Sequence, residues 1–122
     1  MAFTLSIVGQ RKAGVVEVRA EGEATARDFP TQNYNPLEAI VGPGWNSQRI
    51  LIDFGRTGYV DSSAIGWLIS VQKALRQGGG MLVLHSVQPQ VRQLLDMLKI
   101  DRLMALAENL AAARLAAQGQ PA

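Results

Sequence analysis

Three consecutive polar residues, Asp61, Ser62 and Ser63, are the strongest candidates for chemistry in this sequence. They stand between a short apolar segment and a stretch with helical periodicity. Each side chain carries an oxygen that can accept hydrogen bonds from the free amides of a helix's first turn. No Glu or Gln follows any of them at the third position, so the trio is not a capping box. Spacing alone therefore favours a plain helix start over a functional site.

A second feature is the helix face that begins at Ser62. Positions i, i+4, i+7 and i+11 on this face are Ser62, Gly66, Ile69 and Lys73. Gly66 costs the helix about 1 kcal/mol relative to Ala, and it leaves the approach to the Ser62 hydroxyl open. Close packing inside the domain explains the glycine equally well. Ile65 and Ile69 border the apolar stripe of the same helix, either as flanks of the core or as an exposed contact surface. The stripe consists of Ala64, Trp67, Leu68, Val71 and Leu75.

The composition excludes several kinds of catalysis. The 122 residues contain no Cys and a single His, His85. This excludes disulfides, Cys-based zinc sites, thiol catalysis and a multi-His metal site within one chain. No GxGxxG, phosphate-loop or GxSxG motif is present. A hydrolase that uses Ser62 and His85 is the weakest interpretation, and we expect no catalytic residue, metal or cofactor.

Charge and hydropathy indicate a small globular protein. The net charge of +2 is too small to suggest nucleic-acid binding. The first residues lack the cationic region and cleavage site of a signal peptide, and no apolar run approaches the roughly 20 residues that span a bilayer. We therefore expect a cytoplasmic protein without membrane insertion. One domain over residues 1–117 should be followed by a frayed tail at 118–122.

Apolar periodicity predicts alternating strands and helices. Polar and apolar residues alternate over 3–7 and 16–20, on either side of a turn that contains Gly14, which indicates a β-hairpin. Continuous apolar runs at 50–54 and 81–84 predict strands that are buried on both faces. Helical spacing predicts four helices, at 36–41, 63–77, 89–98 and 108–117. A short edge strand is expected at 103–106.

The order of these elements predicts the fold class. Strands that alternate with helices over short connections form right-handed βαβ crossovers, which pair strands in parallel. The N-terminal hairpin adds an antiparallel pair. We therefore expect an α/β fold with a mixed β-sheet of four to five strands and with helices packed on one side. Residues 22–48 are the least legible part, because Pro30, Pro36 and Pro43 interrupt any long helix.

The residues Asp61-Ser62-Ser63, with Gly66 four positions after Ser62, closely resemble the motif of the STAS domain. The glycine-rich turn at 78–80 before an apolar strand supports this resemblance, which covers roughly residues 49–107. More narrowly, the sequence is similar to the bacterial anti-sigma factor antagonists. The resemblance implies a mixed sheet with helices on one side, in agreement with the fold expected from periodicity.

The resemblance also implies a function in transcription regulation. Ser62 would be phosphorylated by a partner serine kinase that is also an anti-sigma factor, and a protein phosphatase would reset it. Asp61 and Ser63 would support the phosphosite. The unphosphorylated protein would bind the kinase and free a sigma factor, and the phosphorylated protein would release the kinase. The domain itself would catalyse nothing.

The same resemblance places the partner on the face of the helix that starts at Ser62. Partner contacts would come from Ile65, Gly66, Ile69 and Lys73, in a protein that is a monomer or a weak dimer. Two features depart from the family pattern: the Pro-broken segment 24–48, and Trp67, where a smaller aliphatic residue is common and core packing explains the change. The alternative function is a non-switching STAS accessory subunit, for example of a lipid-transport ATPase complex.

Overall fold

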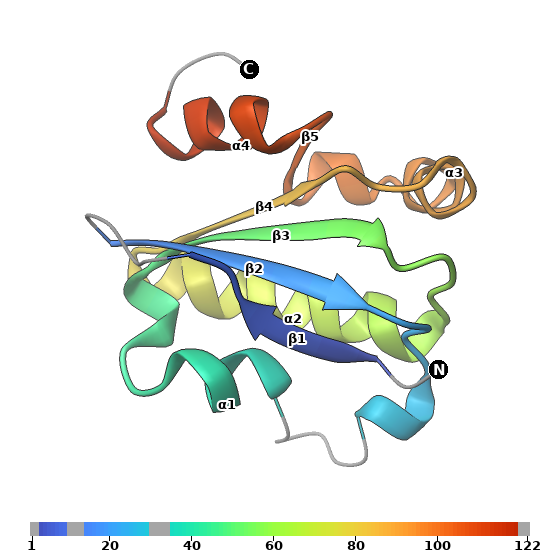
Figure 1. The fold of residues 1–122 in the computed structure, drawn as a ribbon, viewed down its shortest axis with the longest axis horizontal. Coiled ribbons are helices and arrows are strands. Elements are labelled where there is room, and N and C mark those ends of the chain that lie inside the picture. Colours follow the sequence, from blue (N-terminus) through green and yellow to red (C-terminus); the bar gives the residue numbers. More distant parts are fainter. Residues whose placement is uncertain (1–2, 10–13, 30–34, 120–122) are drawn as a thin grey trace.

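The computed structural model describes residues 3–9, 14–29 and 35–119. It contains a single five-stranded sheet in the order β1-β2-β3-β4-β5 (Figure 1). The strands are β1 (Thr4–Ile7), β2 (Val15–Glu21), β3 (Arg49–Arg56), β4 (Met81–His85) and β5 (Ala105–Ala107). The helices are α1 (Pro36–Val41), α2 (Ser62–Gly78), α3 (Pro89–Met97) and α4 (Leu110–Ala117).

The sheet is mixed, as predicted. β1 and β2 pair antiparallel, with Leu5 opposite Ala20, so the N-terminal hairpin is confirmed. The turn residues 10–13 lie outside the described residues. β2, β3, β4 and β5 pair in parallel through helical crossovers. The edge strand β5 begins two residues later than the sequence indicated.

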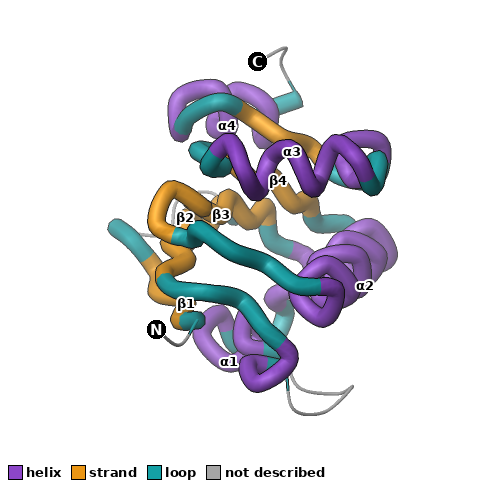
Figure 2. The backbone as a smooth tube through the Cα atoms, turned by 90° about the vertical axis from the view of Figure 1, so that its right-hand side faces the viewer, coloured by secondary structure: helices purple, strands orange, loops and turns teal. Residues whose placement is uncertain are grey.

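The helices cover both faces of the sheet. Ile50 and Ile52 of β3 face a core that α1, α2 and α3 close, whereas Leu51 faces the other side, where it packs with Ala113 and Ala117 of α4. Figure 2 shows α2 and α4 on opposite sides of the strands. The predicted single helical layer therefore holds for three helices and is wrong for α4. A strand that is buried on both faces requires cover on both, and the alanines of α4 supply the second cover.

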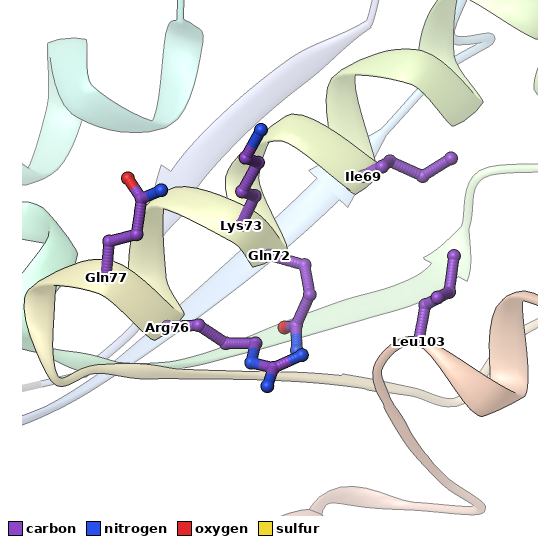
Figure 3. Close-up of a pocket in the computed structure, with 6 residues that line it drawn as sticks. All are labelled: Ile69, Gln72, Lys73, Arg76, Gln77 and Leu103. Carbon is purple, nitrogen blue, oxygen red and sulfur yellow. The ribbon is translucent and has the colours of Figure 1, made fainter.

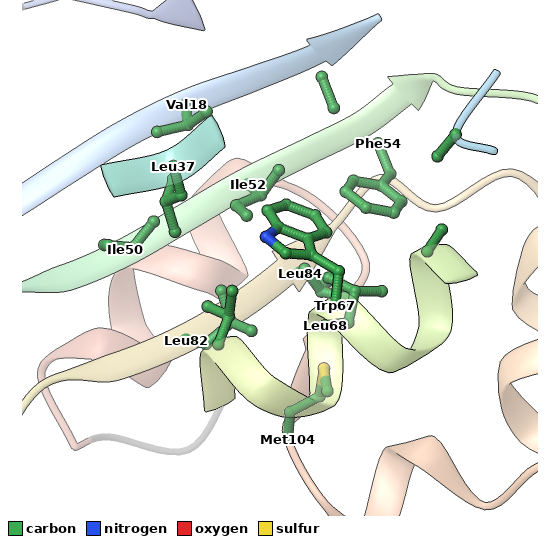
Figure 4. Close-up of a cluster of buried hydrophobic side chains, with 14 of the residues drawn as sticks. Val18, Leu37, Ile50, Ile52, Phe54, Trp67, Leu68, Leu82, Leu84 and Met104 are labelled. Carbon is green, nitrogen blue, oxygen red and sulfur yellow. The ribbon is translucent and has the colours of Figure 1, made fainter. Parts of the chain in front are cut away.

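The segment between β2 and β3 is fastened to α2 by aromatic packing. Trp67 of α2 stacks on Phe29 with ring centroids 5.2 Å apart, and meets Phe3 edge-on at 5.9 Å. Figure 4 shows the Trp67 side chain directed from α2 toward the sheet. Its Nε1 donates to Asn35 Oδ1 at 2.9 Å, and the same oxygen caps α1 by accepting from Leu37 N at 3.0 Å. The core role of Trp67 and the Asn35-Pro36 helix start are confirmed, whereas Pro30 lies outside the described residues.

Glycine is required where α2 turns into β4. Gly79 adopts a left-handed conformation, with φ at 85°, and ends the helix as predicted. A Cβ on Gly80 would collide with the backbone carbonyl oxygens of Gln48 and Asn46. The Gly80 N–H instead donates to Leu75 O at 2.8 Å and to Asn46 O at 3.1 Å. The chain can pass this point only without a side chain.

Candidate functional site

Asp61 connects the start of α2 to the loop that follows β2. Its Oδ1 accepts from Ala64 N at 3.1 Å, which caps the helix, and its Oδ2 accepts from Ala26 N at 2.9 Å. The Asp61 N–H donates to Ala24 O at 3.0 Å. These three hydrogen bonds hold one residue from both sides, so the start of α2 is fixed relative to the sheet.

Ser62 is the first residue of α2, and its side chain is exposed. Because Asp61 caps the helix, the Ser62 hydroxyl is not used for capping, and within the described residues it has no hydrogen-bond partner. Ser63 follows and is half-buried. Backbone N–H groups in the first turn of a helix lack intrahelical acceptors and favour negative charge nearby. The hydroxyl is therefore exposed, and it stands at a helix end that favours negative charge.

The loop before Asp61 is held by glutamine side chains from the segment that starts α3. Gln88 Nε2 donates to Gly55 O at 2.9 Å, and Gln90 Nε2 donates to Gly58 O at 3.4 Å. Tyr59, at the end of this loop, leaves about half of its surface exposed, 51%. No local sequence pattern indicates the two glutamines, because their contacts are made with backbone atoms more than 30 residues away.

The predicted contact residues on α2 do not all lie on its surface. Gly66, Ile69 and Lys73 are exposed, and Ile69 shows 40% of its surface. Ile65 is only 6% exposed and belongs to the core, so the prediction that it forms part of a contact surface is wrong for the free domain. Its side chain lies on the flank of the stripe that α2 buries against the sheet.

Gly66 has no packing role that the structure reveals. A Cβ at this position would meet nothing within 4 Å outside the helix's own backbone. Gly66→Ala should therefore stabilise the domain by about 0.5–1 kcal/mol, because Ala loses less backbone entropy in a helix. Urea unfolding followed by circular dichroism measures this change. Gly80→Ala serves as the opposite control and should destabilise strongly, and a destabilised Gly66→Ala protein would contradict the open geometry.

His85 is separated from Ser62 by the sheet. It is buried on the face that α4 covers, and its Nδ1 lies 2.9 Å from Ser86 Oγ. Burial lowers the pKa of His85, an effect that the charge of Arg114 reinforces and those of Asp53 and Glu17 oppose. Ser62 stands at the start of α2, on the opposite face. The Ser62–His85 pair that a hydrolase would need is therefore not formed.

Among residues 3–9, 14–29 and 35–119, no cluster of three or more His, Asp or Glu side chains is arranged to hold a metal ion. Within the same ranges, no helix has the length and apolar character needed to cross a bilayer.

The fold and the site together define a class of small α/β domain, in which a mixed sheet presents one fixed helix start with an unused serine hydroxyl. The STAS domain family model matches residues 7–113. The chain belongs to the STAS domain family.

Relatives of this chain carry names from one branch of that family. The Anti-sigma F factor antagonist of Paenibacillus polymyxa is 28% identical over 107 residues, which cover 88% of this chain and 90% of the relative. The crystal structure of an anti-sigma factor antagonist from Mycobacterium paratuberculosis aligns with a TM-score of 0.70 at 20% identity, over 94% of this chain and 95% of the other. The resemblance to anti-sigma factor antagonists is confirmed.

A third relative has been solved in two covalent states. The anti-sigma factor antagonist SpoIIAA in its unphosphorylated form aligns with a TM-score of 0.62 at 18% identity, over 94% of this chain and 96% of the other. The Bacillus cell fate determinant SpoIIAA in the phosphorylated form aligns with a TM-score of 0.58 at 21% identity, over 88% and 93% of the two chains. Both likenesses concern the fold.

Proposed function

We propose that this protein is an anti-sigma factor antagonist whose partner binding is switched by phosphorylation of Ser62. The observation that carries the proposal is the exposed Ser62 hydroxyl, which has no hydrogen-bond partner within the described residues because Asp61 alone caps α2. A kinase can reach such a hydroxyl without unfolding any element. The names of the relatives support the same role.

The electrostatics of the helix start suit a switch. A phosphate adds about −1.5 to −2 charges at pH 7. In the free domain this charge lies at a helix N-terminus, where it is favourable by about 0.3–1 kcal/mol. In a docked interface the same charge must lose its water next to the Asp61 carboxylate, whose oxygens already accept two backbone N–H groups. Uncompensated buried charge costs several kcal/mol, so phosphorylation should abolish binding and leave the fold intact.

The proposal assigns a role to each residue at the helix start. Ser62 accepts the phosphate, Asp61 and Ser63 support the site, and Gly66, Ile69 and Lys73 contact the partner. The partners are a cytoplasmic serine kinase that is also an anti-sigma factor, and a phosphatase that removes the phosphate. The domain acts as substrate and docking surface rather than as an enzyme, and it works as a monomer or weak dimer.

Mass spectrometry of the protein from its native cell tests the switch. We expect one phosphate on Ser62 under some growth conditions, absent from a Ser62→Ala strain and retained in a Ser63→Ala strain. The Ser63→Ala control separates two adjacent hydroxyls that differ in exposure. A chain that carries no phosphate on residues 59–73 under any condition would contradict the switch and favour the accessory-subunit function.

A further inference from the structure

A groove of about 450 Å³ lies along the C-terminal half of α2 (Figure 3). One wall is α2 itself, and the other is Leu103, which follows the 3-10 turn Ile100–Arg102. The α2 residues that line the groove are Ile69, Gln72, Lys73, Arg76 and Gln77. The groove therefore joins two segments that are about 30 residues apart in sequence.

The groove combines exposed apolar surface with positive charge. Ile69 and Leu103, which line it from the two walls, leave 40% and 48% of their surfaces exposed. Lys73 and Arg76 are exposed, and within the described part of the chain neither forms an ion pair. The sequence of α2, SSAIGWLISVQKALRQG, contains no Asp or Glu that could neutralise them. Such a lining is complementary to an apolar side chain flanked by carboxylates.

We propose that this groove docks an acidic amphipathic segment of the partner protein. An apolar side chain enters between Ile69 and Leu103, and carboxylates of the same segment meet Lys73 and Arg76. The inference rests on the proposed function in one respect, namely that the segment belongs to the partner that also covers Ser62. An interface of ordinary size buries about 800 Å² on each side, which is enough to include both places.

The positive charges of the groove lie too far from Ser62 for phosphorylation to change what they bind. Lys73 lies eleven positions after Ser62 in the helix, which corresponds to about 16 Å at 1.5 Å per residue. This distance is about two Debye lengths at physiological ionic strength, so a phosphate on Ser62 has little electrostatic effect at the groove. The groove thus provides a constant anchor, and the helix start provides the part of the interface that phosphorylation turns off.

Nuclear magnetic resonance titration with designed peptides tests the groove on the full chain. The probe is a helical peptide with Leu at i, i+3 and i+7 and Glu at the flanking positions, and its twin carries Lys in place of every Glu. We expect the acidic peptide, and not the Lys twin, to shift the amide signals of residues 69–77 and 102–104. Lys73→Glu combined with Arg76→Glu should weaken binding by about tenfold or more.

Matched variants make the outcome decisive. Ile69→Ser should weaken binding of the acidic peptide, whereas Leu115→Ser, on α4 and also 40% exposed, should not. Ser62→Asp should leave the affinity within about twofold. Four outcomes would each overturn the proposal. They are equal binding of the two peptides, no binding of the acidic peptide, amide shifts outside the groove, and an effect of Leu115→Ser equal to that of Ile69→Ser. The absence of phosphate on Ser62 would overturn the switch and leave a positive groove result standing, so the two failures are distinguishable.

Discussion

Ser62→Asp should weaken binding of the purified kinase partner by about a hundredfold or more, while Ser62→Ala should bind as tightly as the natural chain. A hundredfold change corresponds to about 2.7 kcal/mol, which lies within the cost of burying one uncompensated charge. The hydroxyl of Ser62 has no partner within the described residues, so its removal by Ala breaks no intramolecular hydrogen bond. Phosphate carries more charge than Asp, and its effect should be larger still.

Calorimetric titration of the partner with each variant measures these affinities. Ala111→Asp is a matched control, because Ala111 is also exposed in the first turn of a helix, but that helix is α4, on the other face of the sheet. It should reduce binding far less than Ser62→Asp. Thermal unfolding should show that Ser62→Asp leaves the domain at least as stable as before, since a negative charge at a helix start is favourable. Equal partner binding by Ser62→Asp and the natural chain would refute a switch at this position.

Trp67→Ala should lower the free energy of unfolding by about 3–5 kcal/mol. We expect this to be the largest loss among single substitutions at the residues that join segment 24–48 to α2. The buried indole stacks on Phe29, meets Phe3 edge-on and donates to Asn35. Its removal leaves a cavity and takes one donor from the residue that caps α1. Residues 26–29 and 35–41 should therefore loosen before the sheet does.

Trp67→Phe distinguishes the contribution of aromatic packing to stability from that of the hydrogen bond to Asn35. Phe keeps most of the aromatic packing but cannot donate to Asn35, which still accepts from Leu37 N. We expect a loss of about 1–2 kcal/mol, well below that of Ala. Urea unfolding compares the two variants, with Met97→Ala as an exposed control that should change little. A loss under about 1 kcal/mol for Trp67→Ala would show that the aromatic cluster does not hold this segment.

Most of the elements could be predicted because their signals are local. Period-two alternation identified β1 and β2, continuous apolar runs identified β3 and β4, and Asn35-Pro36 identified α1. The stripe of α2 was predicted in the same way. The bounds of short elements were predicted less well. β5 begins at Ala105 rather than 103, because a three-residue edge strand has too few alternating residues to define its bounds.

The burial of residues at the edges of the α2 apolar stripe could not be predicted from local sequence patterns. Ile65 and Ile69 are four residues apart with identical side chains, yet one is 6% and the other 40% exposed. A helical position at the edge of an apolar stripe is buried only if a neighbouring element reaches it. Ile65 lies within the main core cluster, while nothing in the described chain closes the groove over Ile69.

The sequence by itself determined the order and type of the elements, the helix start at Asp61-Ser62-Ser63 and the family resemblance, because each depends on residues close together in the chain. Only the tertiary structure decided which face α4 covers, that Asp61 is also tied to Ala26, and that Leu103 completes a groove with α2. These contacts join residues that are far apart in sequence, and short-range periodicity carries no information about which distant segments meet.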